Sequence, residues 1–125
     1  MQHHPLPEYP RPALRRDSYE NLNGLWQYAI TGSAGLPGGR VLLHFGAVDY
    51  ACAVQVNGHL VGGHRGGYWP FALDITDALN PAGHDRLWVA VQDPTGTGVQ
   101  ARGKQTLRPG GMFYPAQSGI WQTVW

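Results

Sequence analysis

Apolar residues alternate with polar or small residues along much of the chain, which is the period-two spacing of half-buried β-strands. Trp26, Tyr28 and Ile30 share one face in this way, and Val54 and Val56 share another. The pattern predicts strands at 25–30, 41–45, 52–56, 59–61, 69–75, 87–91 and 120–125.

Turn signals separate these strands. Asn57-Gly58 stands between two apolar runs and predicts a tight hairpin, because both residues tolerate positive φ. We expect a glycine loop at 62–67, one helical turn at 76–79 capped by Thr76, and a long irregular segment at 93–118.

Strands joined by turns, with at most one short helix, indicate an all-β fold, either an antiparallel sandwich or a jelly roll. The 125 residues include 18 Gly and 10 Pro, about twice the usual share, which disfavours a helical bundle. The length suits one domain and is too short for a barrel of eight βα units, which needs roughly 200 residues. We expect an extended Pro-rich arm over 1–17 and a β-sandwich domain over 18–125.

Charge and hydropathy exclude several partners. The net charge is +1, and no basic run exceeds Arg15-Arg16, so we expect no nucleic-acid partner. No stretch approaches 18 apolar residues, so we expect no membrane span. The first residues show no secretion signal, which predicts a cytoplasmic protein. The single cysteine, Cys52, lies in an apolar stretch and is interpreted as a buried small side chain.

The titratable residues do not form a recognisable catalytic or metal site. The close histidine pairs, His3-His4 and His59/His64, have no carboxylate or thiolate nearby to complete a ligand set. Glycoside hydrolysis needs two facing carboxylates. The aspartates at positions 49, 74, 77 and 93 fall at strand ends and turns, where Asp usually accepts backbone hydrogen bonds. We therefore expect no catalytic residue, no metal and no cofactor within this chain.

Aromatic and planar polar side chains in the loops are the remaining candidates. Sugars present apolar C–H faces and fans of hydroxyls, which suit aromatic rings beside amide and guanidinium groups. The carbohydrate-proximal candidates are Arg102, Lys104, Gln105, Tyr114 and Trp69. The alternative is that Trp69 and Tyr114 merely close the ends of the sandwich.

Several short motifs occur in a fixed order over nearly the whole chain. They are Pro10-Arg11-Pro12, Asn21-Leu22-Asn23-Gly24-Leu25-Trp26, the segment 43–50, Val56-Asn57-Gly58, the segment 66–71, Asp74-Ile75-Thr76, Arg102-Gly103-Lys104-Gln105 and Ser118-Gly119-Ile120-Trp121-Gln122. Together they resemble the N-terminal domain of glycoside hydrolase family 2, the β-galactosidase and β-glucuronidase group.

The resemblance implies a jelly-roll β-sandwich, often called the sugar-binding domain. In the family this domain precedes an immunoglobulin-like domain and a barrel that carries both catalytic glutamates of a retaining glycosidase. We expect neither glutamate here, so the chain is not an enzyme by itself. The partners implied are a β-glycoside and, in the parent enzyme, the immunoglobulin-like and barrel domains. The Arg102-Gly103-Lys104-Gln105 motif makes 93–118 the segment expected to approach the sugar.

Two departures from the family pattern alter this expectation. Residues 31–40 replace a much longer stretch, so we expect one or two strands to be missing and an open edge to favour self-association. The Pro-rich arm is the candidate cover for that edge. Some β-galactosidases also place an aspartate shortly before the Ser-Gly-Ile motif, whereas Phe113–Gln117 contains none.

Three functions stay open at this point. The first is a non-catalytic sugar-binding and scaffold domain. The second is a free-standing carbohydrate-binding module with Trp69 and Tyr114 as stacking residues. The third is an interaction domain, or a remnant without activity.

Overall fold

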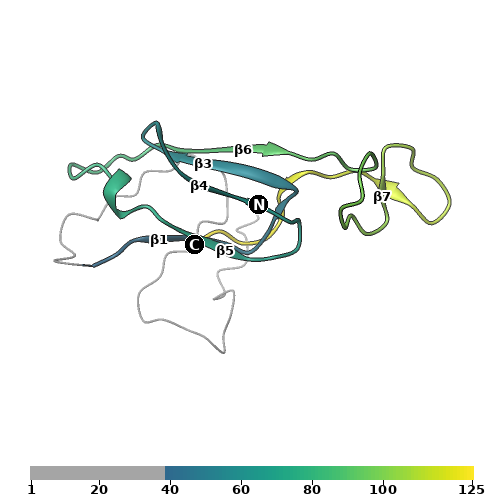
Figure 1. Cartoon of the computed structure of the whole chain (residues 1–125), viewed down its shortest axis with the longest axis horizontal. Helices are drawn as coiled ribbons and strands as arrows, with labels where there is room; N and C mark the ends of the chain where they lie inside the picture. The colour runs from purple at the N-terminus through teal and green to yellow at the C-terminus, as the bar shows by residue number, and fades with distance from the viewer. Residues whose placement is uncertain (1–38) are drawn as a thin grey trace, which may run out of the picture.

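The computed structural model describes residues 39–125 (Figure 1). The elements are β1 Leu42–Phe45, β2 Val48–Asp49, β3 Ala51–Val56, β4 His59–Arg65, β5 Phe71–Asp74, the 3-10 turn η2 Thr76–Ala78, β6 Leu87–Gln92, β7 Gln105–Thr106, β8 Tyr114–Pro115 and β9 Gly119–Ile120. The prediction of an all-β fold is confirmed. Predictions for the arm 1–17, the strand 25–30 and the His3-His4 pair lie outside the described residues.

One layer is a three-stranded antiparallel sheet in the order β4-β3-β6. Strand β4 runs on through the predicted glycine loop, so the expectation of a loop at 62–67 is wrong for 62–65. Gly63 opposes Ala53, and a Cβ at Gly63 would collide with the Cys52 carbonyl oxygen. The glycine therefore lets the two backbones pair where any side chain would separate them.

The second layer pairs β1 with β5, from Leu42 opposite Asp74 to Phe45 opposite Phe71. The last residues of the chain extend this layer along β1, because the His44 amide donates to Trp125 O at 2.8 Å and the Trp125 amide donates to His44 O at 3.0 Å. The predicted continuous strand at 120–125 is wrong. Ile120 pairs with Val48 of β2, and the chain changes partner before Val124 meets Phe45.

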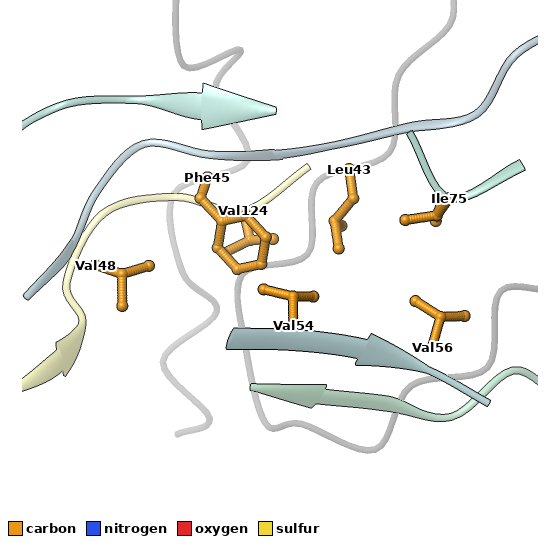
Figure 2. Close-up of a cluster of buried hydrophobic side chains, with 7 residues drawn as sticks. All are labelled: Leu43, Phe45, Val48, Val54, Val56, Ile75 and Val124. Carbon is orange, nitrogen blue, oxygen red and sulfur yellow. The ribbon is translucent and has the colours of Figure 1, made fainter. Parts of the chain in front are cut away.

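Apolar side chains from the two layers meet between them. Figure 2 shows Phe45, Leu43 and Ile75 facing Val54 and Val56 across the gap between the strands, with Val124 beside Phe45 and Val48 at one end of the cluster. Phe45 and Val54 have no exposed surface. The ring of Phe71 extends the cluster by stacking on Phe45, with centroids 4.8 Å apart, and on His64 at 4.4 Å. The alternation read from the sequence therefore corresponds to one core between two sheets.

The Asn57-Gly58 hairpin is confirmed, with φ of 52° and 84° at its two central residues. The Asn57 side chain also fixes the neighbouring segment. Its amide nitrogen donates to Asp85 Oδ1 at 2.6 Å and to Ala78 O at 2.8 Å, and its oxygen accepts from the Arg86 backbone amide at 2.9 Å. This network holds residues 78–86 against the turn.

Thr76 does not cap the helical turn, which corrects the sequence prediction. Residue Ile75 occupies the cap position without a side-chain bond, while the Thr76 hydroxyl accepts from the Val41 amide at 2.9 Å. Asp74 supplies the local acceptor instead, through bonds from the Thr76 amide and hydroxyl. Within residues 39–125, no helix has the length and apolar character needed to cross a membrane.

Candidate functional site

Residues 93–118, called the long loop below, leave one end of the sandwich (Figure 1). The segment carries two short strands, β7 and β8, which pair in parallel with Gln105 opposite Tyr114. The Tyr114 amide donates to the Lys104 carbonyl at 3.0 Å beside this pair. The predicted motif residues are thus brought alongside Tyr114 by backbone bonds within the loop.

Asp93 ties together the two ends of the long loop. Its Oδ1 accepts from the Thr95 amide at 2.7 Å, and its Oδ2 accepts from the Ser118 hydroxyl at 2.6 Å. Burial acts to raise the pKa of Asp93, but the hydrogen bonds from Ser118 and Thr95 outweigh it and hold the pKa below its usual value. The ionised carboxylate is therefore the form that closes the loop.

Gln105 anchors the middle of the long loop to the sandwich. Its side-chain nitrogen donates to Asp49 Oδ2 at 3.0 Å, and its oxygen accepts from the Gln117 amide at 2.7 Å. Asp49 is only 6% exposed. Both ends of the Gln105 amide are engaged within the fold, so this predicted sugar-proximal residue also has a positioning role.

Aromatic residues from two other segments pack beside the loop. Tyr68 meets Trp121 edge-on with ring centroids 5.9 Å apart, and the Trp121 indole donates to Gly67 O at 2.7 Å. A Cβ at Gly103 would lie 3.2 Å from the Tyr68 hydroxyl oxygen, so Tyr68 reaches the Arg102-Gly103-Lys104 turn. Nothing in the sequence indicates that Tyr68, which lies in the motif segment 66–71, approaches that turn.

The other predicted residues are placed as follows. Tyr114 is 65% exposed on β8, and Lys104 is exposed on the turn before β7. Arg102 is half-buried and donates from Nη1 to the Gly98 carbonyl at 3.3 Å. Trp69 lies on the connection between β4 and β5, is 71% exposed, and would be touched by a side chain at Gly66. The exposure of Trp69 and Tyr114 disfavours the alternative that they close the sandwich ends.

The long loop and the body of the sandwich differ in charge. Residues 94–125 contain Arg102, Lys104 and Arg108 and no acidic side chain. Residues 39–93 contain five aspartates and three arginines. The exposed loop therefore presents cations together with aromatic and amide groups, which suits ligands or surfaces rich in oxygen.

Four of the five aspartates in residues 39–125, at positions 49, 74, 85 and 93, accept hydrogen bonds within the fold. Asp74 accepts from Thr76 and lies 3.3 Å from the Arg40 guanidinium, and Asp85 holds the hairpin network. Within residues 39–125, no three His, Cys, Asp or Glu side chains gather as a metal-binding group. Cys52 packs against the core, and burial raises the pKa of its thiol.

Comparisons with known proteins point to a single group of enzymes. No protein-family model matches the sequence. A β-galactosidase of Thermoanaerobacter pseudethanolicus is 37% identical over 90 residues, which cover 70% of this chain and 11% of that enzyme. A β-glucuronidase of Paenibacillus borealis is 34% identical over 73 residues, 58% of this chain and 11% of that enzyme.

A solved structure gives the same correspondence. A structure assigned as a β-galactosidase of Bacteroides fragilis superposes with a TM-score of 0.50 at 32% identity, over 69% of this chain and 12% of that one. The chain thus spans about 11% of the length of the curated relatives it matches. By sequence and by fold, the chain matches part of the β-galactosidases and β-glucuronidases, which are enzymes of glycoside hydrolase family 2, and is consistent with a fragment of such an enzyme.

Proposed function

We propose that the chain is a non-catalytic sugar-binding and scaffold domain of the family 2 type. In this role the sandwich packs against a separate catalytic unit, and the long loop forms one wall of the sugar pocket. The β-glycoside and the immunoglobulin-like and barrel domains are its proposed partners. The chain itself supplies no catalytic group.

One observation carries this proposal. The curated relatives are glycosidases, and the chain covers only about 11% of their length. Exposed cationic and aromatic groups of the chain lie on a loop that is anchored to the sandwich. Lys104 and Tyr114 are exposed on that loop, next to each other through the Tyr114 amide bond to Lys104 O. A scaffold needs such an anchored surface, whereas a hydrolase also needs two facing carboxylates.

The test is functional complementation. The segment matching this chain is deleted from the Thermoanaerobacter pseudethanolicus β-galactosidase, and the present chain is added in trans at increasing concentration. We expect nitrophenyl β-galactoside hydrolysis to rise with the added chain and the chain alone to show none. Failure of binding and activity in the mixture contradicts the scaffold role, and turnover by the chain alone contradicts the non-catalytic assignment.

The free-standing carbohydrate-binding module is the second candidate. The observation that favours it is the exposure of Trp69 and Tyr114, at 71% and 65%. In that case the Trp69→Ala and Tyr114→Ala variants lose glycan binding in the absence of any catalytic unit.

A further inference from the structure

The outer face of the β4-β3-β6 sheet carries a large aromatic residue that the core does not use. Leu87 and Val89 point into the sandwich and pack against its core, so Trp88 between them points outward. Trp88 is 67% exposed. An indole held on a rigid strand with its ring in solvent is a platform for an apolar ligand face.

Polar groups surround this indole. Gln55 of β3 is directly opposite Trp88 and is exposed, because its neighbours Val54 and Val56 fill the core. A groove of about 610 Å³ lies where this face reaches the 57–58 turn. It is lined by Gln55, Asn57, Gly58, His84, Arg86 and Trp88. The lining thus combines an indole, an amide, a guanidinium and an imidazole, with no carboxylate.

The wall of the groove is fixed by the hairpin network. The side-chain oxygen of Asn57 accepts a hydrogen bond from the Arg86 backbone amide, and the Asn57 backbone amide donates to Arg86 O at 2.9 Å. Asp85, 4% exposed, also accepts from the Asn80 amide at 2.6 Å. Arg86 therefore leaves the backbone at a defined point beside Trp88, which lowers the ordering cost of binding there.

The same face continues as a shallow hollow beyond Trp88. Ala53 opposes both Gly63 and Ala90. These small residues line a second depression of about 670 Å³, together with Arg65 and Gln92. The distance from Trp88 to Gln92 along β6 is roughly 13 Å, at about 3.3 Å per residue. Two hollows in line favour an elongated ligand over a single small one.

From these observations we propose that the outer face of β3, β4 and β6 binds a linear oligosaccharide, with one sugar ring stacked on Trp88 and its hydroxyls bonded to Gln55 and Arg86. Pyranose rings offer the apolar face that an indole accepts and the hydroxyl fans that amide and guanidinium groups recognise. The Trp88 end of this site lies by the 57–58 turn, and the long loop leaves the opposite end of the sandwich (Figure 1). This site goes beyond the proposed function, since a scaffold domain needs no second sugar site.

The test measures binding by the full chain to β-1,4-linked hexaoses of glucose, xylose and galactose, by titration calorimetry and by retardation in gels containing the matching polysaccharides. We expect at least one hexaose to bind. We expect Trp88→Ala to weaken that binding about tenfold or more, and Trp88→Tyr to retain part of it. Leu107→Ala, which removes an exposed apolar side chain outside this face, is the control and should leave the affinity unchanged.

Circular dichroism and thermal melting establish that each variant is folded. Should Trp88→Ala fail to fold, Arg86→Gln and Gln55→Ala, both on exposed side chains, take its place, and the expected loss is severalfold in each. Absence of binding to all three hexaoses overturns the proposal, as does binding that Trp88→Ala leaves intact. Neither outcome bears on complementation through the long loop, so the two proposals fail separately.

Discussion

The sandwich and the long loop are stabilised in different ways. In the sandwich, apolar side chains such as Phe45 and Val54 are fully buried between two sheets. In the loop, Leu107, Met112, Phe113 and Tyr114 are all more than half exposed. Two hydrogen bonds hold the loop in place. Ser118 donates to Asp93 where the ends of the loop meet, and Gln105 donates from the middle of the loop to Asp49 of the sandwich.

This contrast indicates that the buried core of the sandwich provides stability, whereas the long loop presents groups that can bind. Burial of apolar surface supplies most of the stability of a domain, and the loop contributes little of it. Exposed aromatic and cationic groups are then free to meet a partner without weakening the fold. Changes in the two regions should accordingly have different readouts.

The largest loss of stability is expected from Phe45→Ala. Phe45 has no exposed surface and stacks on Phe71, so its removal leaves a cavity at the centre of the core. We expect a loss of about 3–5 kcal/mol in the free energy of unfolding, measured by urea denaturation. Phe113→Ala in the loop is the matched control and should change it by no more than about 0.5 kcal/mol. Equal effects of the two would erase the comparison.

A smaller loss is expected at the hairpin. Gly58 has φ of 84° and open space around it, so a β-branched residue there is strained by its backbone alone. We expect Gly58→Val to cost roughly 1–3 kcal/mol. Gly58→Asn should be nearly neutral, because Asn tolerates positive φ. Thermal melts of both variants measure the difference. A loss in both variants would point to a steric cause instead.

The pH dependence of the loop follows from Asp93. Its pKa lies below the usual value in the folded chain, so the carboxylate stabilises the fold fully above its unfolded pKa of about 3.9 and loses this effect as the pH falls through the folded pKa. We expect Asp93→Asn and Ser118→Ala to lower the melting temperature at pH 6. The difference from the unmodified chain should shrink as the pH falls below about 3.9, and a difference that grows over this range would contradict the assignment.

The smallest effect on stability is expected from Lys104→Ala and Tyr114→Ala. Both side chains are exposed, and the Lys104–Tyr114 bond runs through the backbone, which these variants keep. We expect a change in unfolding free energy within about 0.5 kcal/mol, together with a loss of complementation of the domain-deleted enzyme. Complementation that survives both substitutions would separate the loop from the proposed pocket wall.

Sequence reasoning succeeded where periodicity or turn chemistry determines the outcome. The strands at 41–45, 52–56 and 87–91 and the turn at Asn57-Gly58 follow from alternation and from positive φ, and the structure reproduces them within a residue or so. It failed at Gly62–Arg65, where glycine usually marks a loop but here allows close pairing with β3. It also failed at Trp121, where an apolar run hides a change of partner from β2 to β1.

The candidate sites show the same limit. Motif order located Arg102, Lys104, Gln105 and Tyr114 on one loop, and the structure brings Gln105 and Tyr114 opposite each other. Neither the Gln105–Asp49 bond nor the approach of Tyr68 to Gly103 has a local signal, because each joins residues far apart in sequence. Trp88 did have a local signal, because the strand at 87–91 is apolar on both faces although only one face can meet the core.

The pairing of Phe45 with Val124 has a consequence for synthesis on the ribosome. Val124 is 1% exposed and fills the core beside a strand made some eighty residues earlier, so the layer containing β1 stays incomplete until residues 123–125 have emerged. Contacts of such long sequence separation also form slowly. During translation the nascent chain therefore presents the inner faces of β1 and β3 to its surroundings, and this interval is when a holding chaperone would bind it.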